Sequence, residues 1–263
     1  MGNAKIWQKM TVKQIREGLQ DTGTVLIPIG CTEQHGYHLT TDTDNHNAWQ
    51  ISTRAAEKTG SFVAPLLPYT FSGGELEGSI NINLNVVSQM ITEILRALAF
   101  HGLQNLIIVL GHGGSENTEA VERGAYHFVR DYPGYQDRNV AVCNVLMSDI
   151  FRPFYDEERD YHAGAFETSL MMFWAPDEVL KGEITTDRPE ILEMMRDDPD
   201  AYQVSHKNVD VEEVVPRVGQ HPDIEVGVMG DPGKASAQMG EKLAAEAVND
   251  LVSLIKTLEG ANS

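Results

Sequence analysis

The stretch TVLIPIGCTEQHGYHLTTDTD, residues 24–44, changes character at a single glycine. Residues 24–30 are apolar and rich in Val, Leu and Ile, which is typical of a strand buried on both faces. The residues after Gly30 are dense in histidine and carboxylate, namely Glu33, His35, His38, Asp42 and Asp44. A solvated loop needs polar side chains, but it does not need these two kinds packed so closely. The stretch therefore predicts a buried strand that ends at a chemical site.

Three further segments share the strand-like character of residues 24–30. They are SFVAPLLPY (61–69), NLIIVLG (105–111) and NVAVCNVLM (139–147). Helical periodicity lies between and after them, at residues 45–58, 86–101, 116–130, 164–174 and 233–258. Short apolar strands that alternate with helices predict a mainly parallel sheet with helices on both faces, which is an α/β fold of three layers.

The chain has 263 residues, and we expect a single domain over residues 1–263. One part departs from the alternation of strands and helices. Residues 176–224 are rich in Pro, Asp and Glu and contain no long periodic segment. We interpret them as an irregular excursion over the surface of the domain. An excursion of this length is expected to cover a site or a subunit interface.

Composition narrows the classes of function. The formal net charge is −19, and a field of that sign repels phosphate backbones and anionic lipid. We therefore expect no nucleic acid and no membrane as partner, and the sequence has no apolar run of the ~20 residues that a membrane span requires. The cysteines are Cys31 and Cys143 alone, so we expect no disulfide framework and a cytoplasmic location.

Residues able to bind a metal follow three of the predicted strands. They are Glu33, His35 and Asp44 after the first strand, His112 after the third, and His162 and Glu167 after the fourth. The carboxyl ends of parallel strands share one edge of a sheet, where ligands bind, so we expect these side chains to meet. Imidazole and carboxylate groups together suit Zn, Mn or Fe.

These residues also have structural interpretations. Asp42 and Asp44 could form a turn or cap the helix expected near residue 45. His112 lies in the turn GHGGSEN (111–117), whose glycines could bind a phosphate at the N-terminus of the next helix. That turn lacks the GxGxxG spacing and the P-loop lysine, which argues against nucleotide binding. The convergence on strand ends favours a metal or catalytic site.

The chain resembles the creatininase family at four motifs, which occur in the family's order. IPIGCTEQHGYHLTTDTD (27–44) resembles a strand followed by G-x-x-E-x-H-G-x-H-L and a later Asp. GHGGSEN resembles the turn NGHGGN, and HAGAFETS (162–169) resembles HAGE-x-ETS. GVMGDPGKASAQMG (227–240) resembles the closing G-D-P-x-x-A-x-x-x-G. A lone E-x-H would be weak evidence, whereas the ordered set is strong.

This resemblance implies a hydrolase site with two metal ions. Four residues match family ligands, namely Glu33, His35, Asp44 and His112, and Asp44 matches the residue that bridges the ions. Where creatininase itself has its last ligand, this chain has Gly114, so Glu167 is the expected substitute and Glu116 the alternative. His162 matches the family's catalytic histidine. Two polar residues of the first motif have no implied role and are expected to support its turn, namely His38 and Asp42.

The family's type reaction is ring-opening hydrolysis of a small cyclic amide. The resemblance thus implies a metallohydrolase that cleaves a C–N bond with water activated by two divalent ions, zinc being expected and manganese or iron the alternatives. It also implies a homohexamer. The first alternative is a hydrolase that opens a cyclic polyol ketone or diketone of the inosose type at a C–C bond. A metal-dependent lyase or isomerase and a non-catalytic metal-binding protein are further alternatives.

Three departures from the family pattern lie where substrate is expected. Gly113 replaces the aromatic residue that follows the ligand histidine in creatininase, and Ala165 replaces a glutamate of the third motif. FSGGELEGSIN (71–81) lacks the His and Pro of a family segment. These differences argue against creatinine itself as substrate. Four polar residues of that segment could contact a hydroxyl-rich ligand or simply be solvated, namely Ser72, Glu75, Glu77 and Asn81.

Overall fold

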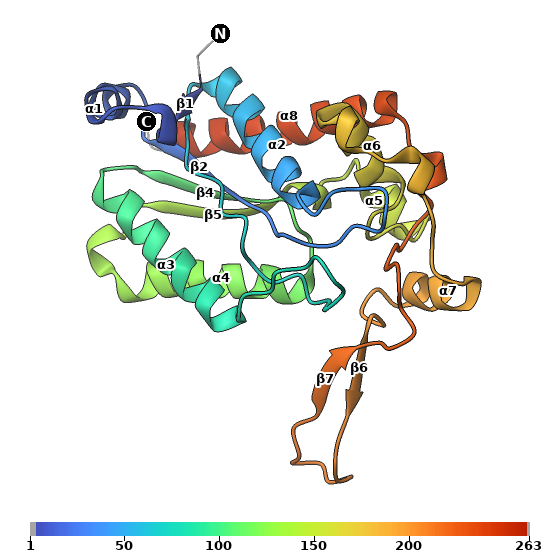
Figure 1. Ribbon diagram of the computed structural model, residues 1–263. Coiled ribbons are helices and arrows are strands. Elements are labelled where there is room, and N and C mark those ends of the chain that lie inside the picture. Colours follow the sequence, from blue (N-terminus) through green and yellow to red (C-terminus); the bar gives the residue numbers. More distant parts are fainter. Residues whose placement is uncertain (1–3, 262–263) are drawn as a thin grey trace.

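The computed structural model describes residues 4–261. Its centre is a five-stranded parallel sheet with the strand order β1-β3-β2-β4-β5 (Figure 1). The strands are β1 (Lys5–Ile6), β2 (Thr24–Ile29), β3 (Phe62–Val63), β4 (Asn105–Leu110) and β5 (Asn139–Asn144). The ends of the expected domain, residues 1–3 and 262–263, lie outside the described residues.

β2 and β4 form the middle of the sheet. They pair in register from Thr24 beside Asn105 to Ile29 beside Leu110. Every residue of both strands is buried, which explains why the two segments read as continuous apolar runs. Because the strands end at the same level, the loops that follow them leave the sheet side by side.

β3 is much shorter than the strand expected at residues 61–69. Only Phe62 and Val63 pair as strand residues, with β1 on one side and β2 on the other. Pro65 and Pro68 follow, and neither can donate a backbone hydrogen bond, so the continuous pairing of β3 with its neighbours stops before them. The chain nevertheless continues beside β2 through a bridge at Leu67.

Helices cover both faces of the sheet (Figure 1). On one face lie α2 (Thr43–Thr59), α6 (Ala165–Trp174) and α8 (Ala237–Ala261), and on the other α3 (Leu84–Phe100) and α4 (Ser115–Asp131). Strand residues alternate between the two cores, with Leu26 and Ile107 in the first and Val25 and Leu106 in the second. The expected single-domain α/β fold of three layers is confirmed.

Two helices lie outside the expected alternation. α1 (Val12–Asp21) begins with a capping box between Thr11 and Gln14. This pair of residues marks a helix start in the sequence, whereas the expected helices rest on hydrophobic periodicity alone. α5 (Arg152–Asp156) is a short helix between β5 and α6. Single turns of 3-10 helix complete the fold, namely η1 (Trp7–Lys9), η2 (Pro133–Tyr135), η3 (Val145–Met147), η4 (Pro176–Glu178), η5 (Lys181–Glu183) and η6 (Pro232–Lys234).

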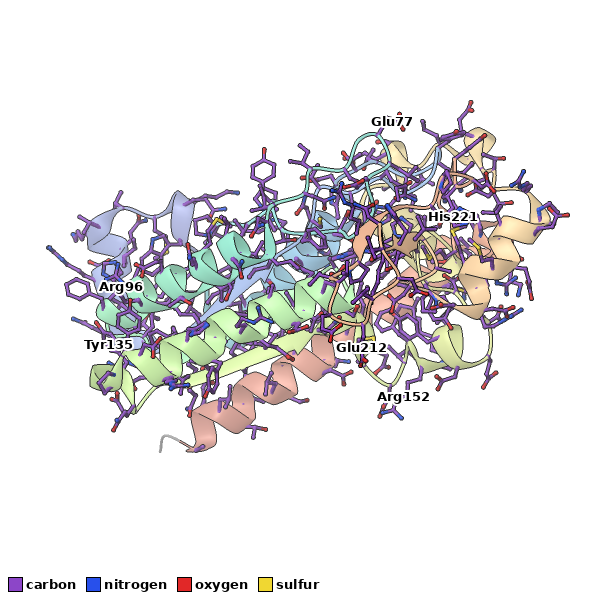
Figure 2. The ribbon with its side chains drawn as sticks, turned by 90° about the horizontal axis from the view of Figure 1, so that it is seen from below. Glu77, Arg96, Tyr135, Arg152, Glu212 and His221 are labelled. Carbon is purple, nitrogen blue, oxygen red and sulfur yellow. The ribbon has the colours of Figure 1, made fainter. Side chains whose placement is uncertain are left out.

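Residues 176–224 contain more regular structure than the sequence indicated. They form α7 (Pro189–Asp197) and an antiparallel hairpin of β6 (Gln203–His206) and β7 (Arg217–Gln220), which extends away from the body of the molecule (Figure 1). Figure 2 shows His221 of this excursion and Glu77 at one end of the sheet, and Arg96 and Tyr135 at the other. Each hairpin strand has only four residues, too few for a recognisable alternation.

α8 is an amphipathic helix of 25 residues. Its buried side chains, among them Leu243, Val248 and Ile255, join the core beneath α2 and α6. The opposite side of the helix is solvent-exposed. Across residues 4–261, no helix combines the length and the apolar character needed to cross a membrane.

Candidate metal centre

Two glycines bring the start of α2 against the ends of β2 and β4. A Cβ atom on Gly30 would lie 2.1 Å from Asn45 Oδ1, and one on Gly111 would lie 2.1 Å from the backbone oxygen of Asp44. No larger residue fits at either position, so the strand ends and the helix touch through their backbones. This contact places Asp44, in the first turn of α2, beside both strand ends.

One group of side chains forms around His112, which directly follows Gly111. His112 Nδ1 lies 3.0 Å from Glu33 Oε2 and 3.2 Å from Asp44 Oδ2. All three side chains are buried, although each is polar. An imidazole nitrogen and two carboxylates, from three different segments, thus face one small volume.

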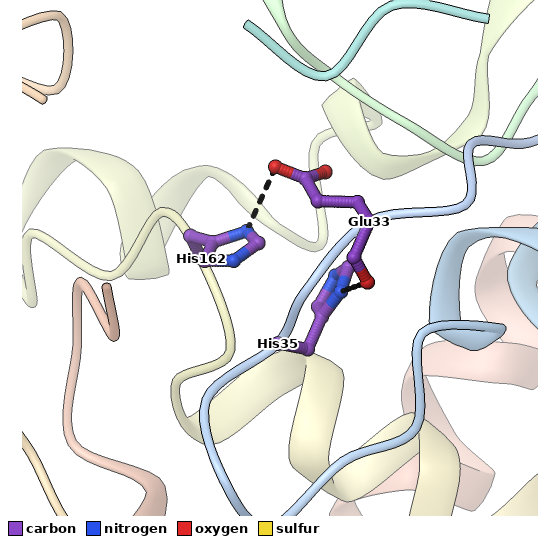
Figure 3. A group of neighbouring side chains, drawn as sticks. All are labelled: Glu33, His35 and His162. Carbon is purple, nitrogen blue, oxygen red and sulfur yellow. Dashed lines mark hydrogen bonds and ion pairs between the residues drawn. The ribbon is translucent and has the colours of Figure 1, made fainter. Parts of the chain in front are cut away.

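A second group forms around His35. Its Nδ1 lies 3.1 Å from the backbone oxygen of Glu33, which assigns the proton to Nδ1 (Figure 3). Nε2 then carries a lone pair, and it lies 3.4 Å from Asp44 Oδ1 and 3.7 Å from Glu167 Oε2. A lone pair that faces two carboxylates requires a proton or a cation between them.

Asp44 belongs to both groups, with one oxygen in each. Both of its oxygens, Glu33 Oε2 and His35 Nε2 are buried atoms without an aligned hydrogen-bond partner. Such atoms are costly and rare in native proteins. Here the unpartnered atoms lie close together without forming hydrogen bonds to one another. Ligand atoms around a cation have this arrangement. The residues could therefore hold divalent metal ions. His35, Asp44 and Glu167 form one group of possible ligands, and Glu33, Asp44 and His112 lie together on the other side of Asp44.

Charges within the cluster outweigh the effect of burial. Burial lowers the pKa of His35, but Asp44 and Glu167 raise this pKa well above its usual value. Burial likewise lowers the pKa of His112, and Glu33 and Asp44 raise it well above its usual value. Burial raises the pKa of Asp44, but the two histidines bring it well below its usual value. Protons on the histidines thus balance the carboxylates until an ion replaces them.

Cys31 lies in the same cluster, although nothing in the sequence analysis gave it a role there. It directly follows Gly30 and is fully buried. Its Sγ and one carboxylate oxygen each of Glu33 and Asp44 lie within 4.8 Å of one another. Burial raises the pKa of its thiol to about 12. The signal that could have found it is its position, two residues before the first expected ligand.

His162 lies beside the cluster, just before α6. Its Nε2 is 2.8 Å from the backbone oxygen of Gln34, so Nε2–H donates and Nδ1 can accept a proton. Nδ1 lies 3.9 Å from Glu33 Oε1, and the ring centroid lies 4.3 Å from that of His35 (Figure 3). His162 could also contact an ion together with Glu33 and His35.

The turn after His162 brings Glu167 to the same place. Ala163 adopts a positive φ of 52°, and its backbone N–H donates to Glu167 Oε2 at 2.6 Å. The turn is thereby fixed by the same oxygen that faces His35. A positive φ is uncommon for a residue with a Cβ atom because it strains the backbone. It persists only where the surrounding structure holds the residue in that conformation.

Glu116, the alternative last ligand, lies outside the cluster. Its Oε2 accepts a hydrogen bond from Gln203 Nε2 at 3.1 Å, so it contacts the excursion instead. Asp42 stands at the N-cap of α2, where its Oδ1 accepts a hydrogen bond from Asn45 Nδ2 at 2.8 Å. Asp42 therefore belongs to the turn that leads into α2, in agreement with its interpretation as a turn residue.

His38 contacts the first turns of α6, which carries Glu167. Its Nε2 lies 2.9 Å from Thr168 Oγ1, next in sequence to Glu167. Burial and the neighbouring charge of His35 lower the pKa of His38 to about 4, so the ring is neutral. A neutral, buried ring packed beside Glu167 holds the start of α6 in place without adding charge.

A cavity of about 360 Å³ opens beside the cluster. Its floor, as we use the term, consists of the lining residues Glu33, His112, His162 and Glu167 and of His35 and Asp44, which contact them. Residues of the excursion line another side, and we call these residues the excursion wall, namely Pro199, Asp200, Tyr202, Gln220 and Ile224. The segment expected to cover a site thus forms part of this cavity.

The polar residues of segment 71–81 mainly hold that segment together. Ser72 N donates to Asn81 Oδ1 at 2.8 Å, and Asn81 Nδ2 donates to the backbone oxygen of Gly74 at 2.6 Å. Glu75 and Glu77 are exposed, and Ser72 alone of the four lines the cavity. Their arrangement favours the interpretation as loop structure over a dedicated site for hydroxyl groups.

Known proteins similar to this chain are hydrolases. The sequence model of the family described as creatininase, creatinine amidohydrolase, matches residues 8–255. A mycofactocin precursor peptide peptidase from Mycolicibacterium smegmatis is 31% identical over 243 residues, which cover 88% of this chain and 84% of that protein. A creatinine amidohydrolase from Pseudomonas putida is 29% identical over 170 residues, covering 58% of this chain and 65% of that protein.

Solved creatininase structures share the fold. A creatininase variant described as of Zn–Zn type has a TM-score of 0.74 at 24% identity, over 96% of this chain and 97% of that chain. A structure described as creatininase with Mn has a TM-score of 0.73 at 24% identity, over 97% of this chain and 98% of that one. Likeness at this identity shows a common fold.

Proposed function

This chain belongs to the creatininase family of hydrolases, and from that premise we propose that it hydrolyses an amide C–N bond with two divalent ions held at the ends of β2 and β4. The observation that carries this proposal is the shared position of Asp44. Its two buried oxygens face different histidines, and neither oxygen has an aligned hydrogen-bond partner. Zinc is the ion we expect, and manganese or iron accept the same ligands.

The residues around the site would hold two ions at nearly balanced charge. Three carboxylates contribute three negative charges, namely Glu33, Asp44 and Glu167. Two divalent ions contribute four positive charges, so these three carboxylates alone would not neutralise them, and the ions would stay able to polarise a carbonyl group. When bound, such ions lower the pKa of water toward ~7 and polarise a carbonyl group.

His162 is the residue we assign to proton transfer. The backbone oxygen of Gln34 holds its Nε2–H, which orients the ring with Nδ1 toward Glu33. In hydrolysis, the oxygen of water bonds to the carbonyl carbon, the C–N bond breaks and a proton moves to the departing nitrogen. Nδ1 would take the proton of the water and deliver it to that nitrogen.

The amide bond is the common element of the candidate substrates. We expect a small cyclic amide, which the cavity of about 360 Å³ can enclose. The similarity to a peptide peptidase over 88% of this chain favours a short peptide as the second candidate. A cyclic polyol ketone ranks third. Ser72 and Asn81, which could have bound its hydroxyl groups, form hydrogen bonds within their own loop instead.

The test is hydrolysis measured with and without ions. Protein stripped by a chelator and then reloaded with Zn²⁺ or Mn²⁺ would be offered five- and six-membered cyclic amides and short peptides in ¹⁸O-labelled water. We expect turnover only after reloading, with one ¹⁸O in the new carboxylate. Turnover that survives chelation, or a product without ¹⁸O, would exclude metal-dependent hydrolysis and favour another class of reaction.

A homohexamer and a cytoplasmic location stay predictions that rest on the family resemblance and on composition. The molecular mass in solution, measured by light scattering, tests the first. A mass six times the 29.1 kDa of one chain would support it. A mass equal to one chain at working concentration would contradict it.

A further inference from the structure

We propose that Cys31 is a ligand, through its thiolate sulfur, of the ion beside Glu33, Asp44 and His112. This inference rests on the proposed function, because it concerns one of the two ions that the function requires. It goes beyond that function by giving one ion a sulfur ligand and leaving the other with nitrogen and oxygen ligands alone. The two ion positions would then differ in the metals that they prefer.

The position of Cys31 in the chain supports the proposal. It is the first residue after Gly30, where β2 has ended and the loop of Glu33 and His35 begins. The tight contact of Gly30 with Asn45 fixes the backbone at this point and brings Asp44 close to it. Cys31 Sγ, one oxygen of Glu33 and one oxygen of Asp44 all lie within 4.8 Å of one another. Ligands of one tetrahedral zinc ion, at ~2.0–2.3 Å from the metal, have separations below this limit.

A second observation, independent of the cysteine, points to an ion at this place. Glu33 Oε2 and Asp44 Oδ2 are buried and have no aligned hydrogen-bond partner. The two residues are only 7% and 1% exposed, and these two oxygen atoms have almost no solvent-accessible surface. His112 Nδ1 faces the same two oxygens at 3.0 and 3.2 Å. Cys31 thus shares Glu33 and Asp44, as neighbours, with His112, and its sulfur would add a further donor atom to these two carboxylates.

The alternative role for Cys31 is that of a small, buried apolar residue. A structural cysteine of that kind packs against hydrocarbon and its reactivity is irrelevant. Cys31 Sγ instead lies next to the carboxylate oxygens of Glu33 and Asp44. Cys143 provides the contrast, because it lies on β5, packs against the core of α2, α6 and α8, and belongs to no group of ligand residues found among residues 4–261.

Sulfur coordination would make the two ions unequal. The ion beside Glu33 would have four protein ligands, with a thiolate that selects zinc over manganese. The ion beside His35 would have Asp44 and Glu167 as its other ligands, a set of hard oxygen and nitrogen donors that also accepts manganese. Three protein ligands leave an open position for water or substrate, whereas four close a tetrahedral set.

Two measurements test the assignment. The first replaces the ions by Co²⁺ in the full-length wild type, in Cys31→Ser and Cys31→Ala, and in the matched control Cys143→Ser. A thiolate bound to Co²⁺ gives a charge-transfer absorption in the near ultraviolet. We expect that absorption in the wild type and in Cys143→Ser and its loss in both Cys31 variants. The second is X-ray absorption at the zinc edge of the wild type, where we expect one sulfur at ~2.3 Å for every two zinc ions.

The outcomes separate this inference from the proposed function. About two ions per chain with neither the absorption nor a zinc–sulfur distance would overturn the role of Cys31 and leave the hydrolase proposal intact. Failure of the wild type to retain any ion would overturn both. Metal content of the Cys31 variants is a further check, since loss of a ligand should weaken zinc binding at least ~10-fold. Because the zinc-edge measurement uses the wild type, a variant that does not fold cannot obscure the result.

Discussion

The floor and the excursion wall of the cavity are built in different ways. The floor residues are buried where β2 and β4 end and where α2 and α6 begin, and Gly30 and Gly111 bring the ends of both strands against the backbone of α2. The excursion wall belongs to a segment whose hairpin exposes its valines, with Val215 85% exposed. Groups that would perform chemistry are thus held by the sheet. Groups that would contact substrate are held by a segment with little core of its own.

Polar contacts join the excursion to α4 and to segment 71–81. Gln203 Nε2 donates to Glu116 Oε2 at 3.1 Å and to the backbone oxygen of Gly73 at 3.3 Å. Glu75 N donates to Gln220 Oε1 at 2.9 Å. Segments held by few, partly exposed hydrogen bonds open at lower free energy than a buried sheet. The comparison therefore predicts large effects for changes in the floor and progressively smaller ones toward the hairpin tip.

The largest effect is expected for Asp44→Asn. The substitution keeps the shape of the side chain but removes the charge that both ions would share. We predict loss of both ions and a fall in kcat/KM of about 10³-fold or more. Asp42→Asn is the matched control, because Asp42 lies two residues away and its carboxylate contacts Asn45 and His46. Equal activity and metal content in wild type and Asp44→Asn would break the distinction between floor and wall.

Removal of the ions is expected to have the next largest effect, and its size depends on pH. In the metal-free protein the pKa of His35 and of His112 is raised above the usual value. Their contribution to stability is present below the unfolded pKa of ~6.5 and is lost as the pH rises through the folded pKa. Ion binding has the opposite dependence, because protons compete with ions for the same nitrogens.

Calorimetry would measure this difference directly. The Tm of chelated and reloaded protein would be compared from about pH 6 to about pH 9. We predict that reloading raises Tm by about 10 °C and that the gap widens with rising pH. A gap that narrows over that range would show that the histidines of the floor are not the groups that the ions displace.

A smaller effect, confined to substrate binding, is expected for the excursion wall. Tyr202→Ala removes a wall residue that also packs against Gly73. We predict a KM about tenfold higher, equivalent to about 1.4 kcal/mol, with kcat within a factor of about three and metal content unchanged. Tyr126→Ala, on the exposed side of α4, is the control. A loss of bound ions in Tyr202→Ala would mean that the wall helps to build the floor.

The smallest effect is expected at the hairpin tip. Val215 is exposed, so Val215→Ser removes almost no buried apolar surface within the chain. We predict a change in the free energy of unfolding within about 0.5 kcal/mol, measured by urea denaturation. A destabilisation above about 1 kcal/mol would indicate that another copy of the chain covers the hairpin in solution.

The sequence predicted the floor better than the wall, for physical reasons. β2 and β4 are buried on both faces, so their apolar runs, and the polar residues directly after them, stand out. The structure brings Glu33, His35, Asp44, His112 and Glu167 together as expected. Their service as metal ligands stays a prediction. Sequence left Glu167 and Glu116 as alternatives for the last ligand, because it does not show that Glu167 lies beside His35 and Glu116 beside Gln203.

Other features lay beyond pattern reading. Residues 61–69 have the apolar composition of a strand, but the two prolines among them shorten the paired segment to two residues. The hairpin of β6 and β7 was missed because its strands are too short to show a period. In the sequence, Cys31 bears only on disulfide content and location. A cysteine in sequence does not show which carboxylates lie next to it in the fold.

The most direct test of the account is a crystal structure of the reloaded protein with anomalous data at the zinc edge. The account predicts two anomalous peaks ~3.5–4 Å apart, one on each side of the Asp44 carboxylate, with Glu167 and not Glu116 beside the peak next to His35. A single peak, or two peaks that do not share Asp44, would contradict it.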